Sequence, residues 1–271
     1  MKVAVTGASG FIGRYVLAEL AQHQVDVVVV TRDANHLADL ALSCKVVEMD
    51  IAVPREDCFE LLGRPDVLIH LAWDGLPNYK SLHHFETELP RQFCFLKKMI
   101  DAGLPSLLVT GTCFEYGMQS GSLAADMPTN PNNPYGYAKD ALRQQLEFLK
   151  SYENFNLTWA RLFYMYGEGQ PSTSLYPKLK EAILNKDLVF NMSGGEQLRD
   201  YLPVHDVARQ IVQLAMNRED VGSVNISSGK PISVRRLVEQ WVSDNRWNIE
   251  LNLGYYPYPD YEPMAFWGKK E

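Results

Sequence analysis

The sequence has few cysteines and no excess of positive charge. Its 271 residues include Cys44, Cys58, Cys94 and Cys113, and no two of these have the CxxC spacing of a zinc knot. There are 33 acidic and 26 basic residues, which gives a formal net charge of -7. Nucleic-acid-binding surfaces, in contrast, are basic. We therefore expect no disulfide, no metal site and no nucleic-acid partner.

Long hydrophobic runs are also absent. The aliphatic run Val27–Val30 has the length of a strand, and no apolar run approaches the length of a membrane span. Met1-Lys2 leads directly into strand-like sequence, without the basic, apolar and small-residue regions of a secretory signal. We expect a cytoplasmic protein with no membrane partner.

The first two thirds of the chain alternate strand-like runs with segments of helical period. Uninterrupted runs rich in Val, Leu and Ile predict strands that are covered on both faces. These runs are Lys2–Thr6, Asp26–Thr31, Lys45–Met49, Asp66–Leu71, Ser106–Thr110 and Leu157–Arg161. The predicted helices between them are Phe11–Gln22, His83–Ala102 and Pro134–Tyr152. This order predicts an α/β fold with a Rossmann-like, doubly wound parallel sheet, which binds ligands at the carboxyl ends of its strands.

The pattern changes near Tyr164, where proline, glycine and aromatic residues become frequent. We predict a cofactor-binding Rossmann domain over residues 1–163 and a smaller, mainly substrate-binding lobe over residues 164–271. Within the second part, a helix at Val204–Asn217 and a strand at Val224–Ile226 have the spacing to pack on the sheet. Residues 203–226 are therefore expected to return to the first domain.

A glycine-rich turn joins the first predicted strand to the first predicted helix. Such a turn lets a pyrophosphate approach the backbone, and the helix N-terminus adds free N–H groups and a positive dipole end. A glycine-rich turn without a ligand is the alternative, but the strand before it and the helix after it favour a dinucleotide site. The predicted contacts are Gly7, Ser9, Gly10, Phe11, Ile12 and Gly13.

The end of the second strand bears on the choice of cofactor. Enzymes that use NAD place an acidic residue there to hold the ribose hydroxyls, whereas this chain has Thr31-Arg32. A hydroxyl beside a guanidinium can bind the 2′-phosphate of NADP. NADP is therefore favoured, with NAD still open because Asp33 follows. Alternatively, Arg32 is a solvated strand-end residue and the enzyme accepts both cofactors.

Three polar residues are candidates for proton transfer and hydrogen bonding to a ligand. Tyr135 and Lys139 lie one helical turn apart in Pro-Tyr-Gly-Tyr-Ala-Lys. A phenol with a pKa near 10 is a poor acid at neutral pH, and a neighbouring ammonium would lower that pKa toward the working range. Thr112 precedes Tyr116-Gly117 after the fifth strand. Its hydroxyl either contacts the substrate oxygen or caps its own backbone.

These motifs resemble the extended short-chain dehydrogenases/reductases, the NAD-dependent epimerase/dehydratase family, over about residues 1–245. The resemblance rests on Thr-Gly-x-x-Gly-x-x-Gly, on Pro-Tyr-Gly-x-x-Lys and on the threonine before Tyr-Gly. It implies that Tyr135 transfers the proton, that Lys139 also holds the nicotinamide ribose, and that Thr112 hydrogen-bonds the substrate oxygen. It further implies cofactor contacts at Asp50, Ile51, Leu71 and Ala72.

The resemblance also places the substrate site, with some departures from the family pattern. Arg199, in Gln-Leu-Arg-Asp-Tyr, would contact the diphosphate of a nucleotide sugar; the alternative is a surface arginine paired with Asp200. Tyr164 stands where the family usually has Asn, and Trp73 replaces a small residue. The chain ends at Glu271, where relatives usually continue through a last helix. The tail at residues 255–267 is then either a packed loop, which we favour, or a partner-binding segment.

The residues after Thr112 favour one reaction among those of the family. Dehydratases of this kind have an Asp-Glu pair there, but this chain has Cys113 and Phe114, which we instead expect to contact substrate along with Trp73 and Tyr164. Epimerases keep NAD bound and carry the acidic strand-two residue, which is absent. We therefore expect NADPH-dependent reduction of a keto group on a nucleotide-diphosphate sugar, with a 4-keto-6-deoxyhexose as in the nucleotide-sugar 4-ketoreductases of deoxysugar biosynthesis. An NAD-dependent epimerase and a non-catalytic NADP sensor stay open, and the family implies a homodimer.

Overall fold

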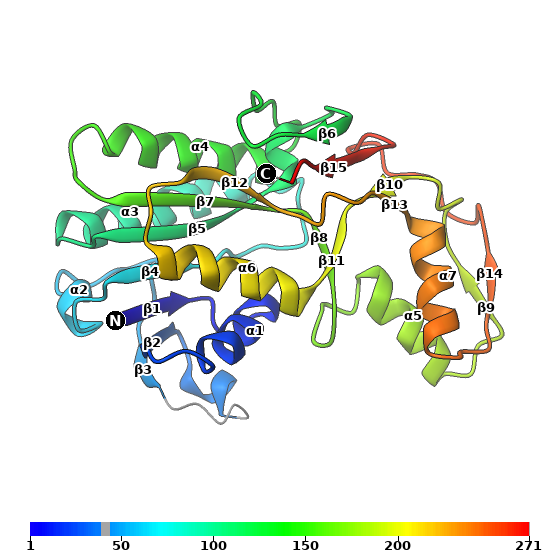
Figure 1. The fold of residues 1–271 in the computed structure, drawn as a ribbon, viewed down its shortest axis with the longest axis horizontal. Coiled ribbons are helices and arrows are strands. Elements are labelled where there is room, and N and C mark those ends of the chain that lie inside the picture. The colour runs from blue at the N-terminus through cyan, green and yellow to red at the C-terminus, as the bar shows by residue number, and fades with distance from the viewer. Residues whose placement is uncertain (39–43, 271) are drawn as a thin grey trace.

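A computed structural model describes residues 1–38 and 44–270 of the chain. Its centre is a seven-stranded sheet with the order β12-β7-β5-β4-β1-β2-β3, in which all neighbouring strands are parallel (Figure 1). The strands are β1 (Lys2–Thr6), β2 (Asp26–Thr31), β3 (Lys45–Glu48), β4 (Val67–His70), β5 (Ser106–Thr112), β7 (Asn156–Leu162) and β12 (Gly222–Ile226). The predicted doubly wound parallel sheet is confirmed, with strand ends shifted by at most two residues.

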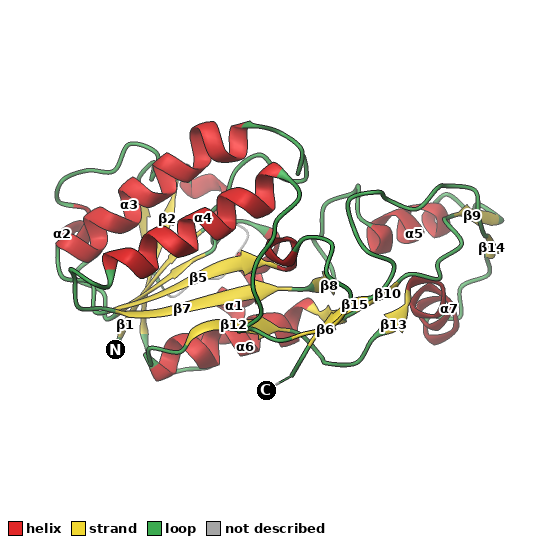
Figure 2. Ribbon diagram, turned by 90° about the horizontal axis from the view of Figure 1, so that it is seen from above, coloured by secondary structure: helices red, strands yellow, loops and turns green. Residues whose placement is uncertain are grey.

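Helices cover both faces of the sheet, as the view in Figure 2 shows. One face carries α2 (Cys58–Leu61), α3 (Leu89–Asp101) and α4 (Pro134–Leu149), and the other carries α1 (Phe11–Leu20) and α6 (Val204–Asn217). Because strand side chains alternate between faces, Ala4 and Val28 join the core under α3 and α4, while Val3, Val5 and Val29 join the core under α1 and α6. Burial on both sides explains the uninterrupted apolar runs.

The helix predicted at His83–Ala102 is interrupted. Residues His84–Glu88 form a π-helical turn, η2, and α3 begins at Leu89 with a proline in its first turn. Proline lacks a backbone N–H and fits the start of a helix, where no intrahelical partner is needed. The π-helical turn buries His84 and Glu88. Periodicity alone does not reveal such a break, because apolar spacing continues across it.

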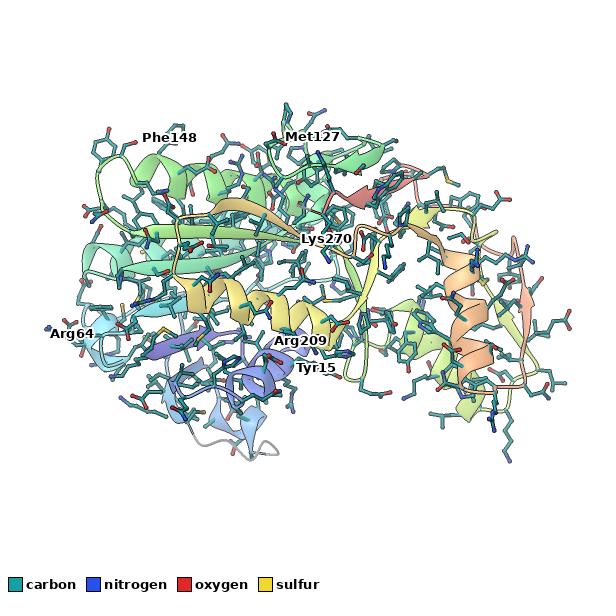
Figure 3. The ribbon with its side chains drawn as sticks, in the orientation of Figure 1. Tyr15, Arg64, Met127, Phe148, Arg209 and Lys270 are labelled. Atoms are coloured by element: carbon teal, nitrogen blue, oxygen red, sulfur yellow. The ribbon has the colours of Figure 1, made fainter. Side chains whose placement is uncertain are left out.

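In α4, Leu142 and Leu146 are fully buried against the sheet. Phe148, by contrast, is 70% exposed and is directed away from the body of the protein (Figure 3). The leucine row of this helix therefore belongs to the core, and Phe148 lies on the outward face.

The second part of the chain forms a smaller lobe, to the right in Figure 1. Two helices, α5 (Leu175–Leu184) and α7 (Val234–Asp244), pack around Trp241, Tyr166 and Tyr176. Short strand pairs complete the lobe and connect it to the sheet: β8 (Tyr164–Tyr166) with β11 (Tyr201–Pro203), β9 (Val189–Asn191) with β14 (Glu250–Asn252), and β10 (Leu198–Arg199) with β13 (Ile232–Ser233). The division at residue 163 falls between β7 and β8 and stays a proposal.

The C-terminal tail runs back from the smaller lobe toward the first domain. Its strand β15 (Phe266–Gly268) pairs in parallel with β6 (Gly121–Leu123), and Ala265 forms an isolated bridge with Leu198. A segment near the C-terminus thereby lies beside one that leads from β5 to α4. Within the described part of the chain, every helix is too short or too polar to cross a bilayer.

Candidate active site

The carboxyl ends of β1 to β4 surround a cavity of about 370 Å³. This is the ligand position expected for a doubly wound sheet. Nine residues predicted to bind the cofactor line it together: Gly7, Ser9, Gly10, Thr31, Arg32, Asp50, Ile51, Leu71 and Ala72. Trp73, predicted to contact substrate, also lines this cavity. Phe11, Gly13 and Lys139 do not line it, and Ile12 lines a second cavity described below.

The glycine-rich turn has the geometry of an anion-binding site. Gly7 has a φ of +71°, and a Cβ there would lie 2.7 Å from the backbone nitrogen of Ala72, so a side chain cannot be accommodated. The N-cap residue of α1 is Gly10, which has no side chain that could accept a hydrogen bond from the first turn. The first N–H groups of the helix and its positive dipole end therefore remain for a ligand. This turn fits the pyrophosphate of a dinucleotide.

Of the two residues expected to bind the 2′-phosphate of NADP at the end of β2, only Arg32 is available. The Thr31 hydroxyl donates to the carbonyl of Asp33 at 2.9 Å, so it is used within its own turn. The Asp33 carboxylate accepts from the backbone of Asn35 at 2.8 Å. Arg32 is exposed, lines the cavity, and has no hydrogen bond or ion pair with any residue that the structure describes. Its guanidinium, and not the Thr31 hydroxyl, is available to an anionic ligand.

Tyr135 lies in the first turn of α4. Asn133 caps this helix by accepting from the backbone of Gly136 at 2.9 Å, and Pro134 occupies the first helical turn. A Cβ at residue 136 would lie 2.6 Å from the carbonyl oxygen of Phe114, so glycine permits the close approach of α4 to the turn that follows β5. The Pro-Tyr-Gly sequence thus places Tyr135 beside Thr112, as predicted from the motifs.

The phenol of Tyr135 is buried in a ring of aromatic side chains. The ring centroids of Trp73, Tyr79, His84 and Phe114 lie 6.0, 5.6, 5.2 and 6.3 Å from that of Tyr135. Burial raises the pKa of Tyr135 well above its ordinary value, and a hydrogen bond with Thr112 opposes this rise only in part. Tyr79 and His84 carry no sequence motif, and sequence reasoning did not identify them.

Lys139 is oriented differently from our expectation. Its ammonium donates to the carbonyl of Thr110 at 2.8 Å and lies 4.1 Å from the ring centre of Trp73. Burial lowers the pKa of Lys139 to about 7. The pKa of Tyr135 is instead raised, with desolvation of the phenol as the largest cause, and the hydrogen bond with Thr112 is what lowers it.

The Thr112 hydroxyl has a structural role as well as its place beside Tyr135. It accepts from the backbone of Phe114 at 3.3 Å, and the Glu115 carboxylate accepts from the backbone of Thr112 at 2.8 Å. This capping box begins the short helix η3 (Cys113–Tyr116). The alternative role that the sequence allowed, capping of its own backbone, is thus present. Contact with the substrate oxygen stays a prediction.

Glu115 is the first carboxylate after Thr112, but it is committed to a structural role. Its side chain is fully buried, accepts from Arg161 at 2.6 Å and accepts from the indole nitrogen of Trp159 at 2.9 Å. A carboxylate fixed by these contacts is not free to exchange protons with a substrate. Cys113 and Phe114 occupy the positions before it, and burial raises the pKa of the Cys113 thiol. The turn therefore lacks a titratable acid–base pair.

Two further cavities adjoin the reacting centre. One, of about 710 Å³, is lined by Thr112, Tyr135 and the predicted substrate residues Cys113, Phe114 and Tyr164. The other, of about 590 Å³, lies in the smaller lobe and is lined by Arg199 and again by Tyr164. The structure thus brings the predicted substrate residues to neighbouring cavities, with the exception of Trp73, which lines the cofactor cavity.

Arg199 is neither at the surface nor paired with Asp200. It is buried, and its Nη2 and Nε donate to Oε2 of Glu262 at 2.8 and 3.2 Å. Nη1 donates to the carbonyls of Leu198 and Met264. The Asp200 carboxylate instead accepts from the backbone of residues 228 and 229. Sequence reasoning missed Glu262 because it is 63 residues away and belongs to no motif.

One group of side chains also has the composition of a metal site. Asp74, His83 and Glu88 place ligand atoms within 4.8 Å of one another. Arg91, however, lies 3.7 Å from the Glu88 carboxylate, whose other oxygen accepts from Gln92 at 2.8 Å. These contacts already satisfy Glu88, and the cluster supports no metal assignment.

Comparisons with known proteins find relatives over the whole length of the chain. A model of the NAD dependent epimerase/dehydratase family matches residues 3–227. The dTDP-6-deoxy-L-talose 4-dehydrogenase (NAD(+)) of Aggregatibacter actinomycetemcomitans is 32% identical over 272 residues, covering 100% of both chains. The GDP-6-deoxy-D-talose 4-dehydrogenase of the same organism is 26% identical over 246 residues, covering 88% of this chain and 78% of the relative. The solved structure of MoeE5 in complex with UDP-glucose and NAD is 25% identical, with a TM-score of 0.81, covering 99% of this chain and 89% of MoeE5.

Proposed function

Because the chain belongs to the NAD dependent epimerase/dehydratase family, we propose that it reduces the 4-keto group of a 6-deoxyhexose nucleotide sugar with a nicotinamide cofactor. The reverse reaction is the oxidation named for two relatives, both of which are 4-dehydrogenases of a 6-deoxytalose nucleotide. These relatives differ in nucleotide and in sugar series. The proposal therefore specifies the reacting carbon, C4, and the 6-deoxyhexose class, and it does not specify the nucleotide or the sugar series.

One observation carries this proposal. Tyr135 and Thr112 line one cavity, and the two residues after Thr112 are Cys113 and Phe114, neither of which is a carboxylic acid. The first carboxylate after them, Glu115, is held in an ion pair with Arg161. With hydride from a bound nicotinamide cofactor, a proton donor beside a hydroxyl is sufficient for carbonyl reduction. Dehydration would require a further acid and base, which this turn does not offer.

The residues of the site then have distinct roles. When bound, the nicotinamide cofactor supplies a hydride to the carbonyl carbon. Tyr135, which burial keeps protonated, donates its proton to the carbonyl oxygen. Thr112 donates a hydrogen bond to the same oxygen and stabilises the charge that develops on it. Gly7, Ser9 and Gly10 would hold the pyrophosphate, and Lys139 the nicotinamide ribose.

NADP remains our proposed cofactor, with NAD as the alternative. The guanidinium of Arg32, which has no partner among the residues that the structure describes, supports NADP, since it lines the cofactor cavity at the end of β2 where no carboxylate occupies the Thr31 position. The relative that covers the whole chain is named for NAD(+). The preference for NADP or NAD is therefore to be measured by comparing the kinetics of the enzyme with the two cofactors.

Replacement of Tyr135 by phenylalanine tests the proposed reaction. With dTDP-6-deoxy-L-talose and NAD+ or NADP+ as probes, we expect Tyr135→Phe to lower kcat by about 10³-fold, because the proton-transferring group is lost. Cofactor affinity, measured by calorimetry, should change by less than about twofold. Tyr137→Phe is the matched control, since Tyr137 lies in the same helix and is 55% exposed.

The proposal would be wrong if Tyr135→Phe kept a kcat within about tenfold of wild type, a barrier change below about 1.4 kcal/mol. Equal decreases of kcat in Tyr135→Phe and Tyr137→Phe would also contradict the proposal. Such a result would mean that disturbance of α4, and not loss of a particular phenol, reduces the rate.

A further inference from the structure

We propose that Glu262, in the C-terminal tail, is a specificity-determining residue that accepts hydrogen bonds from the hydroxyls of a neutral hexose and disfavours sugars that carry a carboxylate. This inference rests on the proposed function in one respect, namely that the ligand is a nucleotide sugar. It goes beyond that function in identifying which feature of the sugar the site recognises and which residue recognises it.

Glu262 lies where the substrate cavities meet. It lines the cavity that contains Tyr135 and Thr112, and it also lines the cavity of the smaller lobe that contains Arg199. A nucleotide sugar that occupies both cavities must therefore pass beside this carboxylate. The sugar, which has to reach Tyr135, is the part of the ligand that lies on the catalytic side of Glu262.

The ion pair with Arg199 leaves hydrogen-bonding capacity on the carboxylate. Both nitrogens of the guanidinium that reach Glu262 contact the same oxygen, Oε2, so Oε1 is outside the ion pair. The two side chains are only 3% and 9% exposed. A carboxylate oxygen in such an environment is stabilised by hydrogen-bond donors, and sugar hydroxyls are donors of this kind.

The same ion pair reduces the attraction of this region for anions. Of the five N–H groups of the guanidinium, two are directed to Glu262 and two to backbone carbonyls, which leaves one. The net charge of the pair is zero, and the carboxylate faces the catalytic cavity. A carboxylate on the sugar would therefore meet a like charge without gaining a free cation.

The tail holds Glu262 in place on both sides. Before it, the Tyr261 carbonyl accepts from Asn132 at 3.2 Å, and the Tyr261 ring packs against Phe114 with centroids 6.2 Å apart. After it, the Met264 carbonyl accepts from the backbone of Leu198 at 2.8 Å, and the next residue contributes to the β6–β15 pairing. A carboxylate anchored in this way is positioned before the ligand arrives, which favours selective binding.

The experiment compares Glu262→Gln with a neutralised carboxylate on the same tail, Asp260→Asn, whose side chain is 84% exposed and outside the cavities. Calorimetry measures binding of UDP-glucose, UDP-glucuronic acid and dTDP, the last of which lacks the hexose. We expect Glu262→Gln to reduce the preference for UDP-glucose over UDP-glucuronic acid by about tenfold, because a charge-assisted hydrogen bond is lost and a repulsion is removed. Affinity for dTDP should change by less than about threefold, and Asp260→Asn should match wild type.

Two outcomes would overturn the inference. The preference could be unchanged in Glu262→Gln, or dTDP could bind about tenfold more tightly, in which case Glu262 only competes with the nucleotide for Arg199. If Glu262→Gln does not fold, Glu262→Asp keeps the charge but shortens the side chain, and a preserved preference there would equally contradict direct recognition. The binding comparison is independent of turnover, so failure of the proposed C4 reaction is distinguished from failure of this inference.

Discussion

At the residue scale, the reacting centre joins a phenol that burial keeps protonated to an ammonium whose charge burial weakens. The pKa of Tyr135 is raised and that of Lys139 is lowered to about 7, and desolvation is the largest cause of both shifts. A protonated phenol suits reduction, in which the carbonyl oxygen has to gain a proton. Lys139 is protonated below a pH of about 7 and loses its charge above it, so a role that requires the cation weakens as pH rises.

Arg32 provides a prediction at the same scale. We expect Arg32→Ala to lower kcat/KM for the NADP cofactor by about tenfold, because one charge-assisted contact with the 2′-phosphate is lost. The value for NAD should change by less than about twofold. Thr31→Asp combined with Arg32→Asn should go further and raise kcat/KM for NAD. Steady-state kinetics with both cofactors measure these effects.

Arg64→Ala is the control, since Arg64 is exposed and its one ion pair is with Glu60 in α2. If Arg32→Ala lowered kcat/KM equally for both cofactors, other residues of the cavity would select the cofactor. The same would follow if the double variant kept the wild-type preference between NADP and NAD.

The residues that we propose to be catalytic could be selected from the sequence because each belongs to a local pattern. Tyr135 and Lys139 are one helical turn apart, and Thr112 is identified by the Tyr-Gly pair that follows it. Glu262, Tyr79 and His84 could not be predicted in this way. They reach the site through tertiary contacts between distant segments, and no spacing rule connects such segments.

At the scale of elements, the turn after β5 shows how a buried ion pair can position a site. Glu115 joins the backbone of Thr112 to Arg161 and Trp159 on β7. It therefore fixes the start of η3, where the residues proposed to contact the substrate lie. The helix period predicted α4 and α6 well, but it predicted neither this turn nor the break before α3, because both depend on buried polar contacts.

We expect Glu115→Ala to lower the free energy of unfolding by about 3–5 kcal/mol, because Arg161 would remain buried without its partner. Urea denaturation measures the change. The control is Asp101→Ala, which removes an exposed ion pair with Lys97 in α3 and should cost less than about 0.5 kcal/mol. A loss below about 1 kcal/mol in Glu115→Ala would mean that the ion pair does not anchor the turn.

At the scale of the whole molecule, the site lies where the carboxyl edge of the sheet meets the smaller lobe. Its residues come from both ends of the chain, from Gly7 in the first turn to Glu262 in the tail. The alternation of strands and helices predicted the sheet edge. The smaller lobe was harder to predict, since its short strand pairs and aromatic core around Trp241 have no long periodic pattern.

A homodimer remains a prediction for the whole molecule. The helices α3 and α4 lie side by side on one face of the sheet (Figure 2), and we predict that they form the subunit interface that the family resemblance implies. Tyr137 and Phe148 are both exposed and lie eleven residues apart, so they share one face of α4. Light scattering at micromolar concentration should give twice the chain mass of 30.8 kDa.

Phe148→Glu should shift that mass toward the monomer, because a charge would replace an apolar contact between subunits. Leu184→Glu, at an exposed position of α5, should have no effect. A monomeric wild-type protein would contradict the prediction.

Transfer of hydride to C4 of the sugar is the central claim, and an isotope measurement tests it most directly. The wild-type enzyme is given the 4-keto form of dTDP-6-deoxy-L-talose and a reduced cofactor with deuterium at the transferable position of the nicotinamide. We predict that one deuterium appears at C4 of the sugar for each cofactor oxidised, as followed by NMR and mass spectrometry. A sugar without deuterium at C4, with no net oxidation of the cofactor, would contradict the account.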